Sequence, residues 1–456
     1  MVTKNQLLTL ECLRLGAELE GICRAGGQTV FVPGALPGER IEARVLKTRP
    51  RYAFAKLERL LAPSPDRQEP PCPAYGQCGG CSGQHMRYEA TLRAKRQNVL
   101  DALQRVGGLP VAEDDVYPVL GAENPLYGRN KTALPVSGGG TEPVLGFYQK
   151  RSHRIVPIKD CPVAMPGLSD VIAVMKDWIR NELEPVSHKE GSLNKEGSGL
   201  LRHVVVRASR NGGRMVLLVA TTPRLPGIPR LIDQLCQKVS GFQALHLSVN
   251  SSPGNTILGS DSQKLHGRDA LAETLLGIEF EISPLAFFQV NPDQTEKLYR
   301  QVMDFAHIGS GNTVVDAYAG TGTIALCMAQ QARQVIGIEI VPQAVTSARR
   351  NAKRNRIDNV VFHNDSVESA LPRLVAKGLR PDVVVLDPPR KGVDPAVIEA
   401  VLTARPYRVV YVSCHAATQA RDIALLAKEG YRLTRCQPVD MFCYAGGVET
   451  VCLLEM

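Results

Sequence analysis

A cysteine stands where a strand is expected to end. Cys414 directly follows the apolar run 408–413 (RVVYVS), and residues 416–427 have the composition of a helix. The run predicts a buried strand, and open α/β sheets place their working residues at the carboxyl ends of such strands. A thiolate there can act as a nucleophile, although cysteine is also a common core residue. The neighbouring groups must decide between these two interpretations.

Acidic residues follow three earlier strand-like runs. Asp316 precedes the turn DAYAGTGT, in which Gly320 and Gly322 allow close approach of the backbone. Glu339 ends the next run, and Asp365 follows the third. An acid at the end of a second strand can accept hydrogen bonds from both ribose hydroxyls. The pattern therefore predicts a Rossmann-like nucleoside site rather than a pyrophosphate site, which would need G-x-G-x-x-G.

A fourth acid is held by two prolines. Asp387 lies in the sequence LDPPRKG, at the end of a further apolar run. Asp-Pro-Pro is also found in plain turns, but at a strand end it makes a rigid polar anchor. Cys414 ends the following strand, so both residues should lie on one edge of the sheet, beside the nucleoside crevice. This placement favours a chemical role for Cys414.

A second group of cysteines lies nearer the N-terminus. Cys72, Cys78 and Cys81 have the spacing C-x5-C-x2-C, and Cys161 is a candidate fourth ligand. Thiols gathered in this way are typical of iron–sulfur clusters, and four thiolates could equally hold zinc. Because we expect a cytosolic chain, its 12 cysteines indicate metal binding or catalysis rather than disulfides.

The chain divides into three regions. Residues 1–62 read as short strands and turns, which predict a small five-stranded barrel of the OB type. Residues 63–268 predict a mixed α+β domain, in which a basic helix near 90–106 (within 90–124) could pack on the catalytic domain, and 187–199 form a polar loop. Residues 269–456 alternate strands and helices, as in a doubly wound α/β sheet. The last barrel strands interleave basic and aromatic residues, which suits RNA but also an ordinary solvated surface: Lys47, Arg49, Arg51, Tyr52, Phe54 and Lys56.

The overall composition agrees with a globular protein that binds polyanions. The 456 residues are 44% hydrophobic and carry a net charge of +9. No apolar run approaches the roughly 18 residues that span a bilayer, and the N-terminus lacks a signal-peptide pattern. We expect a cytoplasmic monomer without a membrane partner.

With these motifs in place, the sequence resembles the bacterial RNA (uracil-5-)-methyltransferases, and most closely those that modify 23S ribosomal RNA. The resemblance covers nearly the whole length. It rests on a TRAM-type barrel, the four-cysteine set and the motifs FFQVNPDQTEKLY, DAYAGTGT, LDPPRKG, YVSC and VDMF…VET.

The resemblance implies a role for each matching residue. S-adenosylmethionine or its crevice would be contacted by Gln289, Tyr318, Glu339 and Asp387. Cys414 would attack C6 of uracil, and Glu449 would remove the C5 proton. The cysteines would hold a 4Fe–4S cluster, and 23S rRNA would be favoured over tRNA: Cys72, Cys78, Cys81 and Cys161.

The sequence departs from the family at several positions. His415 and Ala416 replace the Asn-Pro that often follows the cysteine, and Ala319 stands where the family often has another cysteine. Cys443 and Gly447 replace a proline and a histidine near the C-terminus. None of these positions makes or breaks a bond in the expected reaction, so the departures bear on which uridine is chosen.

Three other functions remain open at this point. An exocyclic-amine methyltransferase would have an aromatic residue in place of Arg390 and no need of a nucleophilic thiol. A cytosine C5 methyltransferase would share the thiol chemistry but leave the barrel and the four cysteines unexplained. A non-catalytic RNA-binding protein would need neither Cys414 nor Glu449.

Overall fold

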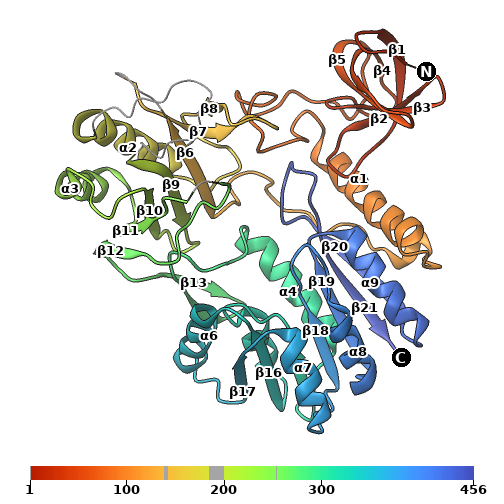
Figure 1. Cartoon of the computed structure of the whole chain (residues 1–456), viewed down its shortest axis with the longest axis vertical. Helices are drawn as coiled ribbons and strands as arrows, with labels where there is room; N and C mark the ends of the chain where they lie inside the picture. Colours follow the sequence, from red (N-terminus) through yellow and green to blue (C-terminus); the bar gives the residue numbers. More distant parts are fainter. Residues whose placement is uncertain (1, 138–141, 184–199, 253) are drawn as a thin grey trace.

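The structure is a computed structural model that describes residues 2–137, 142–183, 200–252 and 254–456. The loop predicted at 187–199 lies outside these residues. Figure 1 shows a small barrel, a central sheet and a larger α/β domain, with the barrel joined to the rest by a long connection that includes α1. No described helix has both the length and the apolar character needed to cross a bilayer.

The N-terminal unit is a closed five-stranded barrel, as the sequence predicted. Its strands follow the order β1-β2-β3-β5-β4. Alternate residues of each strand point inward, and Val30, Ile41, Ala43 and Val45 form its interior. The strands are β1 (Leu7–Leu15), β2 (Gly21–Ala25), β3 (Gln28–Val32), β4 (Arg40–Thr48) and β5 (Tyr52–Ala62).

The central unit is a mixed seven-stranded sheet in the order β12-β11-β10-β9-β6-β7-β8. Two helices cover one face, and Trp178 of α2 is fully buried between that helix and the sheet. The elements are β6 (Lys131–Ser137), β7 (Val144–Tyr148), β8 (Ile155–Pro157), α2 (Leu168–Glu182), β9 (Leu201–Ala208), β10 (Arg214–Ala220), α3 (Ile228–Lys238), β11 (Phe242–Val249) and β12 (Gln263–Gly267).

The C-terminal unit is a seven-stranded sheet in the order β17-β16-β15-β18-β19-β21-β20. β21 is antiparallel to both of its neighbours, and the other pairs are parallel. A hairpin of β13 (Leu271–Leu275) and β14 (Ile278–Ile282) precedes it. The remaining elements are α4 (Pro292–Ala306), β15 (Thr313–Asp316), α5 (Thr323–Ala329), β16 (Gln334–Glu339), α6 (Pro342–Arg354), β17 (Val360–Asn364), α7 (Val367–Ala376), β18 (Val383–Leu386), α8 (Pro395–Ala404), β19 (Arg408–Ser413), α9 (Ala416–Lys428), β20 (Arg432–Val439) and β21 (Glu449–Glu455).

Two apolar cores lie on the two faces of this sheet. One contains α4, α5, α6 and the hairpin, and the other contains α7, α8 and α9. Because both faces are covered, the central strands are almost entirely valine, isoleucine and leucine. The strand order reverses direction between β15 and β18, which opens a crevice at their carboxyl ends.

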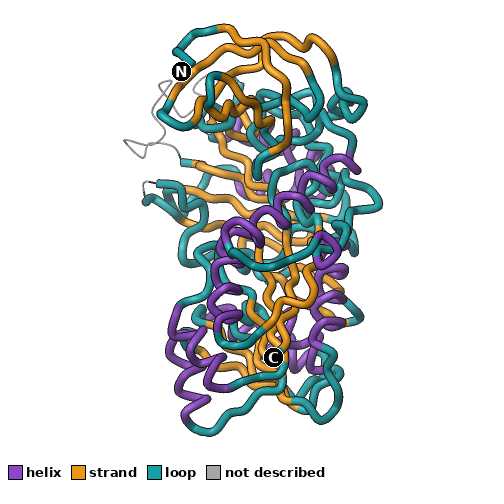
Figure 2. The backbone as a smooth tube through the Cα atoms, turned by 90° about the vertical axis from the view of Figure 1, so that its right-hand side faces the viewer, coloured by secondary structure: helices purple, strands orange, loops and turns teal. Residues whose placement is uncertain are grey.

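An N-terminal helix completes the second of these cores. α1 (Tyr88–Asp101) continues as a π-helical turn, Ala102–Val106. Val99, Leu100 and Leu103 are buried in the same cluster as Ile423 of α9. Figure 1 shows this segment leaving the barrel and running along the α/β unit, and Figure 2 shows the barrel at one end of the molecule. The sheet is therefore covered in part by residues that come before the central unit in sequence.

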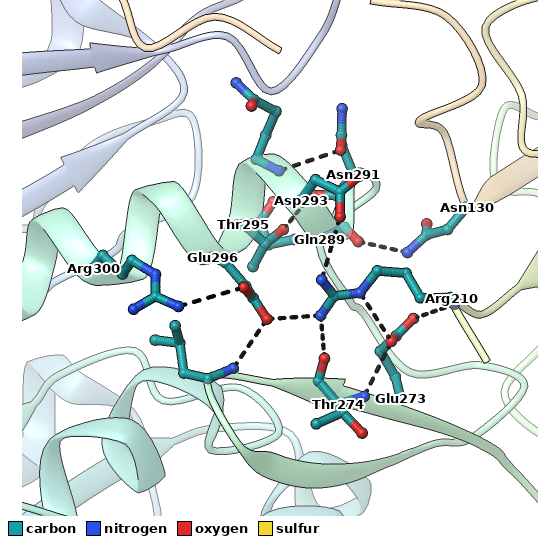
Figure 3. Close-up of polar contacts among 12 residues, drawn as sticks. Asn130, Arg210, Glu273, Thr274, Gln289, Asn291, Asp293, Thr295, Glu296 and Arg300 are labelled. Atoms are coloured by element: carbon teal, nitrogen blue, oxygen red, sulfur yellow. Dashed lines mark hydrogen bonds and ion pairs between the residues drawn. The ribbon is translucent and has the colours of Figure 1, made fainter. Parts of the chain in front are cut away.

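The central and C-terminal units are joined by a network of polar contacts (Figure 3). Arg210, in the turn between β9 and β10, reaches three carboxylates of the C-terminal unit: Glu273, Asp293 and Glu296. Its backbone N–H also donates to Glu273 (3.1 Å), whose side chain is fully buried. A charge-assisted network of this kind fixes the orientation of α4 relative to the central sheet.

Candidate active site

A cavity of about 820 Å³ opens at the carboxyl ends of β15, β16 and β18, with part of its wall supplied by the central unit. Its volume is in the range typical of cofactor sites, about 300–1,000 Å³. Five residues that the sequence singled out line it together: Gln289, Tyr318, Gly320, Glu339 and Asp387.

Glu339 is fixed by the backbone on both sides. One carboxylate oxygen accepts a hydrogen bond from the N–H of Gly320 (2.9 Å), and the other accepts from the N–H of Val341 (2.7 Å). The carboxylate therefore faces the cavity in a defined orientation and keeps free lone pairs. Such an acid can accept further hydrogen bonds from a pair of vicinal hydroxyls.

The glycine-rich turn is closely packed around this acid. Gly322 has φ +83°, and a Cβ there would lie 2.9 Å from the Phe362 ring. Both the backbone conformation and the space thus demand glycine. The N–H groups of the turn and of the start of α5 can in this way come close to a ligand in the cavity.

Gln289 is positioned by the central unit. Its carbonyl oxygen accepts a hydrogen bond from Asn130 (3.0 Å), as Figure 3 shows. Arg207 of β9 donates to the carbonyl oxygens of Pro284 and Ala286, which come shortly before Gln289 in the chain. Asn291 then caps α4 by accepting from the N–H of Gln294. The segment 284–291 is held in place before any ligand arrives.

Two carboxyls interact at the cavity: the half-buried Asp387, which is part of its wall, and the buried Asp316. Burial raises the pKa of Asp387 to about 7. Burial and the adjacent Asp387 carboxylate together raise the pKa of Asp316 to about 7. Charged forms of both would be unfavourable in this setting unless a cation lies nearby.

Cys414 and Glu449 lie at the same edge of the sheet. Cys414 follows β19 and Glu449 begins the adjacent β21, with Ser413 and Thr450 as direct strand partners. Glu449 is buried, and this burial together with Asp387 raises its pKa to about 8, while Arg390 acts in the opposite direction.

The thiol itself has a raised pKa. Burial is the main cause for Cys414, followed by the negative charge of Glu449, and the Arg390 guanidinium opposes both by a hydrogen bond and by its charge. Burial therefore acts against the thiolate form that a nucleophile needs. A neutral Glu449 and a well-placed Arg390 would both favour the thiolate.

Asp365 lies outside the cavity wall. One of its oxygens accepts from Arg373 (2.8 Å) and the other from the N–H of Ser366 (2.8 Å). Its neighbours Ser366 and Val367 line the cavity instead. The segment after the third strand thus contributes Ser366 and Val367 to the cavity wall, and not Asp365.

The four N-terminal cysteines share one small cavity. Cys72, Cys78, Cys81 and Cys161 all line it, together with Arg129. Burial raises the pKa of Cys81 to about 11, and nearby thiolates add to this while Arg129 opposes it. Among the described residues, no group of three or more His, Cys, Asp and Glu side chains is arranged to hold a metal ion.

Two residues at the site had no assigned role in the sequence analysis. Arg390 lies inside the LDPPRKG motif, and its proximity to Cys414 could have been expected from the shared sheet edge. Phe287 lines the cavity although 73% of its surface is exposed. An aromatic side chain that remains exposed next to a polar site is a typical signal of ligand contact.

Two parts of the chain match known protein families. Residues 268–456 match the family described as tRNA (Uracil-5-)-methyltransferase, and residues 2–57 match the TRAM domain. A crystal structure of the Pyrococcus abyssi tRNA (uracil-54, C5)-methyltransferase with S-adenosyl-L-homocysteine superposes with a TM-score of 0.77 at 26% identity. That similarity covers 98% of this chain and 100% of the other.

Full-length relatives give the same result. An uncharacterized RNA methyltransferase of Clostridium tetani is 41% identical over 99% of this chain and 97% of its own length. Another from Halalkalibacterium halodurans is 40% identical over 100% of this chain and 98% of its own. The chain therefore belongs to the RNA methyltransferases, as an S-adenosylmethionine-dependent enzyme of the (uracil-5-)-methyltransferase family that carries an N-terminal TRAM domain.

Proposed function

We propose that the enzyme methylates C5 of a uridine in RNA, with 23S ribosomal RNA as the first candidate substrate, through a covalent bond between Cys414 and C6 of the base. The observation that carries this proposal is the meeting of a thiol, a buried acid and a cation, Cys414, Glu449 and Arg390, beside the cavity.

The cavity fits S-adenosylmethionine. Glu339 would accept the ribose hydroxyls, Gly320 allows the backbone to approach, and Gln289, Tyr318 and Asp387 line the rest of the wall. The cofactor would supply the methyl group as part of a sulfonium cation. Since Asp316 and Asp387 are acids with raised pKa values, a cation there would favour their ionised forms. Asp365 would contribute to cofactor binding by positioning its neighbours Ser366 and Val367, which line the cavity.

The reaction needs Cys414 and Glu449 one after the other, in two successive steps. C5 of uracil is a weak nucleophile, and addition of the Cys414 thiolate to C6 moves electron density to C5. After C5 has gained its methyl group, the proton on C5 must leave before the C6–S bond can break. Glu449, once ionised, can take that proton, and elimination then restores the double bond and releases Cys414.

Phe287 suits contact with the target base. Its exposed ring lies on the cavity wall, where a base taken out of its stack could find a new stacking partner. The barrel would hold the surrounding RNA, since the exposed Tyr52 at the start of β5 directly follows the basic β4–β5 turn.

We also propose that the four cysteines hold a 4Fe–4S cluster. All four line one cavity, and thiolate is the usual ligand of such clusters. We assign the cluster a structural role, since its ligands join the segment before α1 to the central unit.

The choice between ribosomal RNA and tRNA needs a direct experiment. The tRNA enzyme of known structure matches along its whole length, so the barrel does not distinguish the two substrates. Purified protein should be incubated with methyl-labelled cofactor and with either 23S rRNA or tRNA that lacks 5-methyluridine. Digestion to nucleosides should yield labelled 5-methyluridine, from rRNA in the first instance. Labelled 5-methylcytidine, or no label in either RNA, would overturn the proposal, and label only in tRNA would correct the substrate.

A further inference from the structure

An ion pair is completely buried between α1 and the segment that leads to Glu449. The Lys95 ammonium donates to Asp440 at 2.5 Å, and both side chains are 0% exposed. The same ammonium donates to the carbonyl oxygen of Phe442 (3.0 Å). Tyr88, about two turns earlier on the same face of α1, donates its hydroxyl to the other Asp440 oxygen (2.6 Å).

The backbone of Asp440 is held as well. Its N–H donates to the Leu120 carbonyl (3.0 Å), and its carbonyl accepts from the Gln294 side chain of α4 (3.1 Å). The Tyr88 hydroxyl also accepts from the N–H of Ala122 (2.8 Å). Asp440 thus joins α1, α4 and the connection between them.

Asp440 starts the loop 440–448, which connects β20 to β21, and two other N-terminal segments hold the rest of it. The Tyr444 carbonyl accepts from the N–H groups of Ser82 and Gly83, each at 2.9 Å, just after the last cysteine of the C-x5-C-x2-C motif. Gly446 lies against the barrel turn, where a Cβ would come within 2.5 Å of the Ala17 carbonyl oxygen. Figure 1 shows this blue loop rising from the sheet toward the segment that precedes α1.

The two ends of the loop adjoin Glu449. Val439 and Glu449 are direct partners in the β20–β21 pair, and Asp440 follows Val439. By contrast, Cys414 is placed by β19 and α9, whereas the hydrogen bonds of the Lys95 ammonium go to Asp440 and Phe442. None of Lys95, Asp440 or Tyr88 lines the cofactor cavity. A shift of Asp440 would therefore affect Glu449 more than the nucleophile or the cofactor.

A buried ion pair is not needed for stability in itself. Taking two charges out of water costs about as much as their attraction returns, and an apolar pair of similar volume often stabilises a fold as well or better. What this pair provides is specificity, because hydrogen bonds depend on direction. They hold the loop in one position, which apolar packing would not do. From this we propose that Lys95, Asp440 and Tyr88 are positioning residues that set the Glu449 carboxylate for removal of the C5 proton.

The inference rests on the proposed covalent mechanism and predicts a particular kinetic defect. If Glu449 is displaced, Cys414 can still attack and the methyl group can still be transferred, but the adduct resolves slowly. Tyr88→Phe removes one hydrogen bond to Asp440 and should lower turnover about 10-fold. The covalent enzyme–RNA complex, measured on a denaturing gel with labelled RNA, should accumulate while cofactor affinity stays unchanged.

A double substitution separates positioning from stability. Lys95→Met alone leaves Asp440 as an unpaired buried charge and could unfold the protein. Lys95→Met with Asp440→Leu replaces the ion pair by an apolar pair, so the thermal transition should return close to that of the wild type. The adduct should still accumulate. Recovery of turnover together with stability would show a purely structural role and overturn the inference.

Lys297→Met is the matched control. Lys297 donates to the Gly121 carbonyl (2.6 Å), next to Ala122, but has no contact with Asp440. This variant should lose the hydrogen bond to Gly121, and the covalent adduct should not accumulate. Parallel loss of adduct formation and turnover in folded Tyr88→Phe would also overturn the inference. A failure of Glu449→Gln to accumulate adduct would instead show that the proposed mechanism is wrong.

Discussion

Thr450 is the strand partner of Ser413, and its hydroxyl donates a hydrogen bond to the Ser413 carbonyl oxygen at 3.1 Å. This contact fixes β21 against β19 at the edge of the sheet where the cavity opens. The residue after Ser413 is Cys414, and the residue before Thr450 is Glu449. The proposed nucleophile and the proposed base, which are far apart in sequence, are thereby held at one place by a single strand register.

The two residues can be separated by their effects on the covalent intermediate. Cys414→Ala should abolish turnover and form no RNA complex that survives denaturation. Glu449→Gln keeps the shape of the side chain but cannot take a proton, so turnover should fall at least about 100-fold while the complex accumulates. RNA with 5-fluorouridine should trap the wild-type enzyme in the same way. A trapped complex with Cys414→Ala would point to another thiol, with Cys443 nearest in sequence.

The carboxyls with raised pKa values predict that stability depends on pH. Asp316 and Asp387 have pKa values of about 7 and Glu449 about 8, whereas unfolded carboxyls titrate near pH 4. Between about pH 4 and 8 the folded chain therefore holds protons that the unfolded chain has released, so the free energy of unfolding should fall as the pH rises. Thermal unfolding of the ligand-free protein at several pH values measures this slope. Glu449→Gln should make it shallower, and an unchanged slope would contradict a raised pKa for Glu449.

Activity should show the opposite trend over part of the same range. Glu449 must be ionised to take a proton, and the thiolate of Cys414 also becomes more abundant as the pH rises. The value of kcat/KM should therefore increase with pH through the region near 8, where Glu449 titrates in the free enzyme. Arg390→Met removes the cation that favours both ionised groups, so this rise should move to higher pH. A profile that is flat from pH 6 to 9 would exclude Glu449 as the base.

Cofactor affinity should depend on Glu339 and much less on Asp365. Glu339→Gln exchanges one acceptor for an NH2 group that faces a backbone N–H, and calorimetry should show a loss of about 10-fold, or ~1.4 kcal/mol. Asp365→Asn is the control, because its carboxylate pairs with Arg373 and does not line the cavity. Equal losses in the two variants would establish Asp365 as a direct ligand.

The four-cysteine site should contain iron. Protein purified without oxygen should be brown and hold about four iron atoms per chain. Cys161→Ser should lose the iron and weaken RNA binding, with little change in cofactor affinity. Cys236→Ser, which removes an exposed cysteine elsewhere in the central unit, should keep both colour and iron. Stoichiometric zinc and a colourless protein would instead favour a tetrahedral zinc site.

RNA binding by the barrel can be measured through its salt dependence. Arg49 and Arg51 are exposed on the β4–β5 turn, and their replacement by alanine should weaken RNA binding and reduce the slope of log K against log salt by about 0.7 for each phosphate contact to single strands. Arg432→Ala removes an exposed charge at the amino end of β20, opposite the cavity, and should change neither quantity. If the slopes measured after replacement of Arg49 and of Arg51 match that of the wild type, the charged turn of the barrel does not contact phosphates.

The sequence was sufficient for features that are local or repeat along the chain. Short strands separated by turns predicted the barrel, and apolar runs separated by helices predicted the doubly wound sheet. Motifs at strand ends identified Glu339, Asp387 and Cys414, because parallel strands bring their carboxyl ends to one edge. Glu449 was recognised only through a family resemblance, since its strand is antiparallel to its neighbours and begins, rather than ends, at that edge.

Long-range packing decided what the sequence left open. The raised pKa of Cys414 depends on burial and on Glu449, which lies on another strand, and the opposing Arg390 comes from a third segment. Likewise, nothing in the segment around Lys95 indicates that its ammonium is buried against Asp440 near the other end of the chain. Charge states and positions of this kind arise from the local dielectric and from neighbours brought together by folding, and residue types and spacing do not contain them.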